Sequence, residues 1–329
     1  MLAAEEGANQ RRGRHKGAPR GGGHSRKAAG GGWLLVRPRE SWPPWSGGMS
    51  MELYHQPEDA TKGNEGELHG SWFVFTYSSA YRHSERELQA AVETADPGQL
   101  QRVLQQWPYQ VDALLRLSDY TMRTGQHELS SELIEKALFA FQSALHPMCK
   151  LAHGRARLSY AHKPNQIFFH TLFRHMVNLG RRRAPSHSPA FSRASVHLSP
   201  SLPNIAHRRG CPRTAFETAR LLLSLEPSSD PTHVLLHIDY YALTAGDPSF
   251  VLKLPRMLPS HSLLLYPNQA YSFALASKQS GEVDSDERLE QALLLFPAVF
   301  PLLLPRIAPT TASQESDQLV HPKPCLPSR

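Results

Sequence analysis

Apolar residues recur at helical spacing over most of the chain, and the clearest run extends from residue 209 to residue 230. Its apolar positions fall at i, i+4 and i+7, so one side of a helix would form a broad hydrophobic stripe. Pro212 suits the first turn, where a missing N–H costs nothing, and Pro227 ends the helix. Residues 232–243 follow after a short polar turn and predict another helix. The first stripe consists of Ala215, Phe216, Ala219, Leu222 and Leu223.

The same pattern predicts further helices on both sides of this pair. An amphipathic helix cannot bury its stripe alone, so the pattern indicates an all-α protein built of stacked helix pairs. Ser84 and Glu87 have the spacing of a capping box in the first helix, and a stripe from Leu289 to Phe296 marks the last clear one. The other predicted helices begin near residues 81, 100, 109, 126, 166, 250 and 268.

The helices at residues 109–123 and 126–145 make the best-defined pair, joined by a turn at Thr124-Gly125. The second of them aligns Leu129, Leu133 and Ala137 on one face. Pattern and turn resemble a tetratricopeptide unit. With residues 181–209 set aside, later pairs begin about 36–37 residues apart, close to the roughly 34 of that repeat. The predicted fold class is therefore a degenerate tetratricopeptide-like α-solenoid.

Tryptophan and proline dominate residues 33–51, and the prolines exclude a helix there. Trp33, Trp42 and Trp45 favour an extended strap that lays aromatic rings on a helical surface. A proline-rich ligand for an SH3 or WW domain is the alternative. Residues 72–77, WFVFTY, favour a strand or an extended packing segment, whereas residues 146–163 indicate a connector.

Two other segments interrupt the helical pattern. Residues 181–209 are rich in Ser, Pro, Arg and His, and a retained intron or a lineage-specific loop would both produce them. A regulated loop phosphorylated at Ser186 and Ser188 is a third interpretation. Proline recurs every fourth residue from Pro297 to Pro309, which excludes a regular helix interior, so we expect an extended apolar segment lying on the last helix pair.

These patterns predict four regions in the chain. They are a disordered Gly/Arg arm at residues 1–32, an extended Trp/Pro strap at 33–80, a helical-repeat domain at 81–304 with a disordered insert at 181–209, and a disordered tail at 305–329.

The net charge of +7 is concentrated in two segments. Residues 1–40 hold nine basic and three acidic residues, and residues 181–209 hold six arginines and no acid, which leaves about −5 on the rest of the chain. Binding to nucleic acid would therefore have to use these two segments. The N-terminus lacks the apolar core of a secretory signal, and no apolar run approaches the length of a membrane span. The three widely spaced cysteines favour a reducing compartment.

A search for catalytic patterns assigns no residue. The sequence has no P-loop, no G-x-G-x-x-G after a strand, no H-E-x-x-H and no G-x-S-x-G. His233 and His237 have the spacing of two metal ligands on one helix face, but Asp239 would point to another side, so structural histidines are the preferred interpretation. Cys211 lies at a helix start without a partner base. We expect no catalytic, cofactor-binding or metal residue, and no enzyme.

Glutamate residues also gather on one predicted helix. We interpret Glu128, Glu132 and Glu135, with Lys136, as a solvated helix face and not as a catalytic acid pair.

Several sequence strings together identify a family. The strings PYQVDALLRLSDY, FQSALHP, RGCPRTAFETARLLLSLEP and LEQALLLFP resemble the helical core of the transcription factor 25 family, and ESWPPWSGGMSMEL with WFVFTYSSAYR resemble the segment that leads into it. The resemblance covers residues 33–180 and 210–304. Three features depart from the family pattern: a short Gly/Arg arm replaces a long acidic and lysine-rich region, residues 181–209 have no counterpart, and further helices are missing at the end.

The resemblance implies a non-enzymatic adaptor subunit of the ribosome quality control complex, which supports ubiquitin-dependent clearance of stalled nascent chains. The implied partners are the large ribosomal subunit, a Listerin-type ubiquitin ligase, a nuclear-export-mediator-factor-type subunit and a p97-type segregase. The implied location is the cytosol, on ribosomes, with the nucleus as a second location. The alternative function is a nuclear transcriptional regulator whose basic arms contact nucleic acid. No cofactor, small-molecule substrate or membrane is implied.

Overall fold

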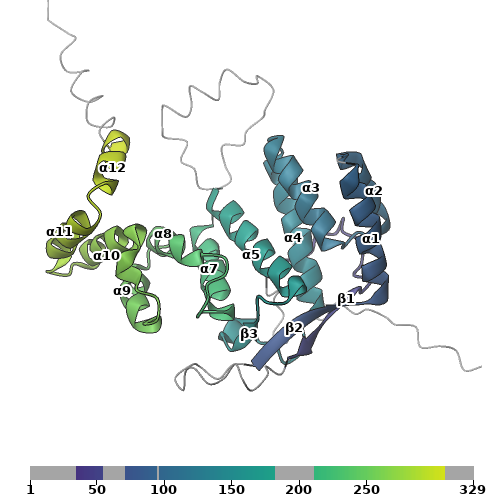
Figure 1. The fold of residues 1–329 in the computed structure, drawn as a ribbon, viewed down its shortest axis with the longest axis horizontal. Helices are drawn as coiled ribbons and strands as arrows, with labels where there is room; N and C mark the ends of the chain where they lie inside the picture. The colour runs from purple at the N-terminus through teal and green to yellow at the C-terminus, as the bar shows by residue number, and fades with distance from the viewer. Residues whose placement is uncertain (1–34, 55–70, 95, 182–210, 308–329) are drawn as a thin grey trace, which may run out of the picture.

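The computed structural model describes residues 35–54, 71–94, 96–181 and 211–307, and it is mostly helical (Figure 1). The helices lie beside one another in a row that follows the chain, from α1 and α2 at one end to α11 and α12 at the other. A small sheet lies along one side of the first half of this row. The predicted helical character is thus confirmed, whereas the relation to tetratricopeptide repeats stays a prediction.

The helix bounds follow the predicted ones closely from α1 to α7. In α7, for example, Pro212 occupies the first turn, and the helix ends at Leu225, two residues before Pro227, as predicted. The helices are α1 (Ser79–Glu93), α2 (Pro97–Gln106), α3 (Val111–Arg123), α4 (His127–Ala144), α5 (Lys163–Arg181), α7 (Pro212–Leu225), α8 (Ile238–Thr244), α9 (Pro248–Met257), α10 (Pro267–Ser280), α11 (Ser285–Leu295) and α12 (Val299–Ile307), with short 3₁₀ turns η2 (Leu151–His153), η4 (Val234–Leu236) and η5 (Leu263–Leu265).

The described residues also form a three-stranded sheet, in the order β1-β2-β3. Strand β1 (Met49–Leu53) pairs antiparallel with β2 (Ser71–Tyr77), and β2 pairs parallel with β3 (Ala156–Leu158). The strand predicted at residues 72–77 is confirmed. Strand β3 was not predicted, because three residues inside a connector are too few to show a two-residue period.

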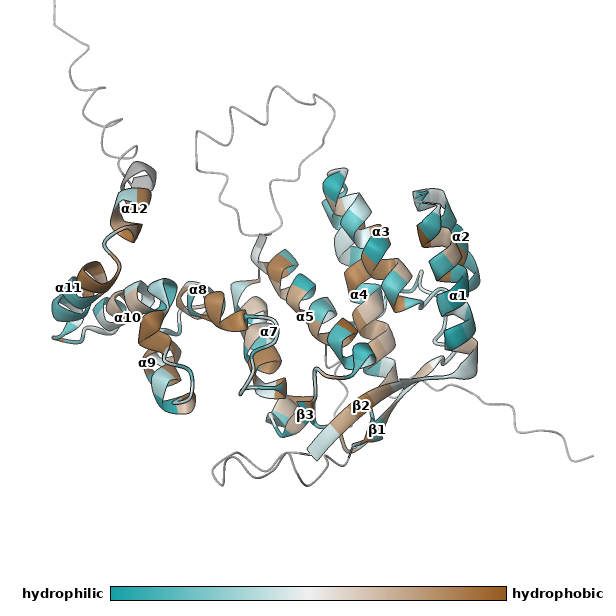
Figure 2. Cartoon of the chain, in the orientation of Figure 1, coloured by the Kyte–Doolittle hydropathy of each residue, from teal (hydrophilic) through white to brown (hydrophobic). Residues whose placement is uncertain are grey.

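The largest buried side chains gather where β2 meets α4 and α5. Phe75 packs edge-on against Phe141 at a centroid distance of 4.9 Å and lies 5.2 Å from Phe168. Asn165, fully buried at the start of α5, accepts a hydrogen bond from the Phe75 N–H (3.0 Å) and donates to the carbonyls of Phe73 (3.3 Å) and Ser159 (2.9 Å). This side chain therefore ties the sheet to the helical row. Figure 2 shows hydrophobic stretches in the middle of β2 and along α4, two of the elements that meet in this region.

Two predictions near helix starts are wrong. The capping box at Ser84 and Glu87 is absent, because α1 begins earlier and Ser78 caps it by accepting from the Tyr81 N–H (3.2 Å). Ser84 instead lies inside the helix and donates to the Tyr81 carbonyl, while the Glu87 carboxylate accepts from the Trp107 indole N–H at 2.7 Å. The spacing of the motif is present, but Ser78, six residues before Ser84, is the N-cap residue of this helix.

The single helix predicted at residues 232–243 is also wrong. Asp230 and His233 both have positive φ, and the buried Asp230 carboxylate accepts from the N–H groups of Val234 (2.9 Å) and Leu235 (3.0 Å). These bonds hold the backbone in η4, and α8 begins only at Ile238. An aspartate can satisfy such free N–H groups locally, which competes with continuing a helix.

The extended segment predicted after residue 297 is a helix, α12. Pro301 falls in its first turn, where no intrahelical partner for an N–H exists, so the ring is tolerated there. Only Pro305 removes an interior hydrogen bond, close to the end of the helix. The boundary predicted at residue 305 consequently falls inside α12.

Some predicted apolar stripes are not buried. Leu129, in the first turn of α4, is 41% exposed, whereas Leu133 and Ala137 further along the same face are buried. In α11 only Ala292 of the predicted stripe is buried, and Leu289 is 42% exposed. The end of the helical row therefore leaves much of its apolar surface uncovered.

Candidate interaction surface

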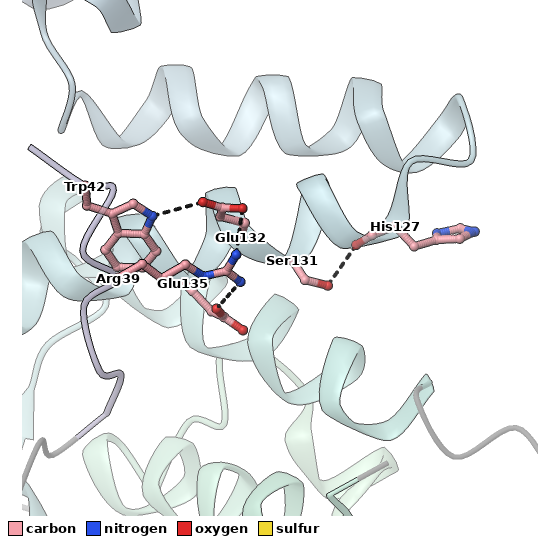
Figure 3. Close-up of polar contacts among 6 residues, drawn as sticks. All are labelled: Arg39, Trp42, His127, Ser131, Glu132 and Glu135. Atoms are coloured by element: carbon pink, nitrogen blue, oxygen red, sulfur yellow. Dashed lines mark hydrogen bonds and ion pairs between the residues drawn. The ribbon is translucent and has the colours of Figure 1, made fainter. Parts of the chain in front are cut away.

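Residues 35–48 run along α4 before the chain enters β1, and we call this segment the strap. Arg39 forms ion pairs with Glu132 (2.8 Å) and Glu135 (3.2 Å), one turn apart on α4 (Figure 3). Both acids face the strap, while on the neighbouring turn the Ser131 hydroxyl donates to the His127 carbonyl at 2.9 Å within α4. The guanidinium thus holds the strap to one face of the helix.

Two tryptophans of the strap anchor it to α4 and to Tyr109, just before α3. The Trp42 indole N–H donates to Glu132 at 3.0 Å, and its ring lies 5.8 Å from that of Phe139. Trp45 packs edge-on against Tyr109 at 5.3 Å, and the Tyr109 hydroxyl donates to the Pro43 carbonyl. Burial raises the pKa of Tyr109 to about 12, so this hydroxyl keeps its proton. Trp42 and Trp45 thus pack against other residues of this chain, as expected for a strap and not for a ligand of an SH3 or WW domain. Trp33 lies outside the described residues.

The first described residues of the strap are fixed by one amide. The Gln142 side-chain oxygen accepts from the N–H groups of Leu35 (2.7 Å) and Val36 (3.1 Å), and its nitrogen donates to the Val36 carbonyl (3.2 Å). These contacts resemble those of a neighbouring strand, although a side chain makes them. The start of the strap is therefore held near the C-terminal end of α4.

The glutamate face of α4 is only partly solvated, which corrects the sequence interpretation. Glu128 is exposed, but Glu132 and Glu135 bind the strap, and their side chains are 30% and 17% exposed. The Lys136 ammonium lies 5.4 Å from the centre of the Tyr109 ring, and burial lowers its pKa. From sequence, the arginine and tryptophans of the strap were the only signal that these acids had partners.

A groove of about 620 Å³ lies beside the strap, between α5, α7, α9 and residues 151–157. Its charged groups are already engaged. The Arg157 guanidinium donates to the carbonyls of Gly154 (2.8 Å) and Ser224 (2.6 Å), and Arg220 pairs with Glu217 at 3.1 Å. The hydroxyls of Thr218 and Ser224 in the lining donate to backbone carbonyls of their own helix, at 2.8 and 2.7 Å, so the groove has the character of a binding surface.

The residues considered as metal ligands are not brought together. His233 precedes η4 and His237 follows it, so the two do not share one helix face. The His237 ring packs edge-on against Phe173 at 5.4 Å, and Asp239 accepts from the Ser272 hydroxyl at 2.6 Å. Within the described ranges no three His, Cys, Asp or Glu side chains are grouped to hold a metal ion.

The described cysteines differ in environment. Cys211 is exposed at the start of α7, as predicted. Cys149 is buried, and burial raises its pKa to about 12. Cys325, Ser186 and Ser188 lie outside the described residues, as do the arm at 1–32 and almost all of the insert at 181–209. In the part of the chain that the structure describes, no helix is both long and apolar enough to cross a membrane.

The sequence matches a known family over most of its length. A family model described as "Transcriptional repressor TCF25" matches residues 73–202 and 203–323. Mouse and human proteins named "Ribosome quality control complex subunit TCF25" are 33% and 32% identical over 287 residues, which is 83% and 82% of this chain. "Ribosome quality control complex subunit 1" of Schizosaccharomyces pombe is 32% identical over 74% of the chain.

The chain is much shorter than these relatives. It spans 37% of the mouse and human proteins and 32% of the yeast protein. The match nevertheless includes most of β2, the helices that contact the strap and every residue of the groove lining except Leu35. The chain therefore belongs to the Tcf25 family.

Proposed function

We propose that this chain is a non-enzymatic adaptor of ribosome quality control, which binds other proteins through the surface of its helical row. The observation that carries the proposal is the match to relatives named as subunits of the ribosome quality control complex, over about four fifths of the chain. The proposed task is to support ubiquitin-dependent clearance of stalled nascent chains on the large ribosomal subunit. The proposed site of action is the cytosol, on ribosomes.

The character of the described surface supports an adaptor. The groove has mainly apolar walls, its charged groups are paired with one another or with backbone carbonyls, and the described histidines and cysteines are scattered. A hydrolase or transferase would need a nucleophile, a base and an oxyanion site held together. The proposed partners are the large subunit, a Listerin-type ligase, a nuclear-export-mediator-factor-type subunit and a p97-type segregase.

Co-sedimentation tests this proposal directly. The purified chain is mixed with large ribosomal subunits that carry a stalled nascent chain, with and without a Listerin-type ligase, and separated on a gradient. We expect the chain to sediment with the stalled subunits and not with empty ones. The matched variants are Trp42→Ala, which loosens the strap, and Tyr120→Ala, at an exposed position of α3 away from it.

Two results would overturn the proposal: no co-sedimentation under any of these conditions, or equal binding to empty and stalled subunits. Binding to RNA or DNA alone that falls steeply with salt would instead favour the regulator with basic arms. The segments that such a regulator would use lie almost entirely outside the described residues, and no described contact favours it.

A further inference from the structure

The groove beside the strap has apolar walls that no described residue fills. Leucines from three helices and from the segment after α4 line it, and Leu35, the first described residue of the strap, forms part of the same lining. Its volume of about 620 Å³ falls in the range of sites that enclose an organic group. The lining residues that matter here are Leu35, Leu138, Leu151, Leu172, Leu221 and Phe250.

The course of the strap leads into this groove. Followed toward the N-terminus, the strap contacts Tyr109 through Trp45, then Glu132 through Trp42 and Arg39, and finally Gln142 through Leu35. The contacts thus advance along α4 by ten residues, or about 15 Å. Because an extended chain covers about 3.3–3.6 Å per residue, the two residues before Leu35 are within reach of the groove walls.

We propose that this groove is the docking site of Trp33 and Leu34 of the same chain. These are the apolar residues directly before Leu35, and glycines precede them. A buried tryptophan side chain covers about 150–250 Å² and usually finds an acceptor for its N–H. The Glu217 carboxylate on the groove wall pairs with Arg220 but has further lone pairs for such a bond, as Glu132 binds both Arg39 and Trp42.

Attachment to the chain strengthens this docking. The Gln142 contacts hold Leu35 at the edge of the groove, so Trp33 has an effective concentration that reaches the millimolar range for a short flexible linker. An apolar segment of another protein would have to compete with this internal ligand. The inference does not depend on the proposed role in ribosome quality control.

Fluorescence of Trp33 tests the proposal in the full chain. The spectrum of Trp33→Phe is subtracted from that of the unchanged chain, which isolates Trp33 from the other four tryptophans. We expect a blue-shifted difference spectrum that acrylamide quenches poorly. Leu221→Glu and Met257→Glu place a charge on the groove wall, and each is expected to give Trp33 the emission and quenching of free tryptophan.

The controls separate docking from general damage. Met257 is 57% exposed, so its replacement leaves the fold intact even if Leu221→Glu disturbs it. Leu236→Glu, at a 47% exposed position outside the groove, should leave the Trp33 signal unchanged. The proposal is overturned if Trp33 is solvent-like in the unchanged chain, or if neither groove variant alters it. Protection that rises with protein concentration would also overturn it, because Trp33 would then occupy the groove of a second copy.

Discussion

The two halves of the described chain bury their apolar residues to very different degrees. Among the residues whose burial is described, those up to residue 180 include only Leu53, Tyr120, Leu129 and Met148 as exposed large hydrophobic residues, whereas residues 211–303 include thirteen. In the first half, a sheet, the strap and a cluster of phenylalanines pack against the helices, and α4 contacts all three. The second half is held mainly by helix-on-helix contacts, and its last helices contact few other elements. Repeating helices bury a stripe only where a neighbour, a strand or a strap covers it.

Thiol reactivity should show the largest difference between the halves. In a Cys325→Ser chain at pH 8, Cys211 should react with an aromatic disulfide reagent while Cys149 stays protected. With a pKa of about 12, only about one Cys149 thiol in 10⁴ is ionised at this pH, and the thiolate is the reacting species. In denaturant, Cys149 and Cys211 should react at similar rates. Rapid loss of both thiols in the folded chain would mean that the first half is less closed than described.

Truncation in the phenylalanine cluster should cost the most stability. Phe141→Ala removes a fully buried ring between Phe75 and Phe168, and cores of this kind lose roughly 3–5 kcal/mol of unfolding free energy. Urea unfolding followed by circular dichroism measures the shift in midpoint. Phe300→Ala in α12, at a 44% exposed position, is the matched control and should shift it little. Equal losses of unfolding free energy in the two variants would contradict the difference in burial between the two halves.

Removing the hydrogen bonds of Asn165, which connect β2 to α5, should cause the next largest loss of unfolding free energy. Asn165→Leu leaves the buried Phe75 N–H without its acceptor, and an unsatisfied buried group costs roughly 1–3 kcal/mol. Hydrogen exchange at the Phe75 amide should accelerate more than exchange in α10. A uniform acceleration in both halves would show that the sheet does not stabilise the first half separately.

The strap should contribute modestly through its ion pair. A double-mutant cycle with Arg39→Met and Glu132→Gln is expected to give a coupling energy of about 0.5 kcal/mol, because Arg39 is 43% exposed and solvent screens the pair. The same cycle at 1 M NaCl should approach zero. A coupling above about 2 kcal/mol would mean that the strap is as much a part of the core as β2.

The smallest effect is expected at the end of the row. Leu294 is 76% exposed, so Leu294→Glu should change the unfolding free energy by less than about 0.5 kcal/mol. The same change should reduce binding of a dye that reports exposed apolar surface. A large loss of stability would instead indicate that α11 is covered in solution.

Sequence periodicity predicted the helices whose stripes and stops agree, such as α3, α4, α5 and α7. It failed where a single side chain redirected the backbone. The Asp230 carboxylate accepts from the Val234 N–H, so the backbone forms η4 where a helix start was predicted. Ser78, not Ser84, accepts the N-cap hydrogen bond of α1. Pro301 lies in the first turn of α12, where proline is tolerated, and no local pattern marks the residue at which this helix begins. For the candidate surface, the sequence indicated the packing role of the tryptophans and the acidic face of α4. It did not indicate that Trp42 and Glu132 bind each other.

The sequence alone determined that this chain forms amphipathic helices, because the 3.6-residue period and its proline and glycine stops are local properties of the chain. Family membership also came from the sequence. Only the tertiary structure decided which stripes are covered, that residues 156–158 complete a sheet with β2, and that the strap runs along α4 to the edge of a groove. These features join residues 85 to 107 positions apart, and their free energy depends on geometry that no local pattern contains.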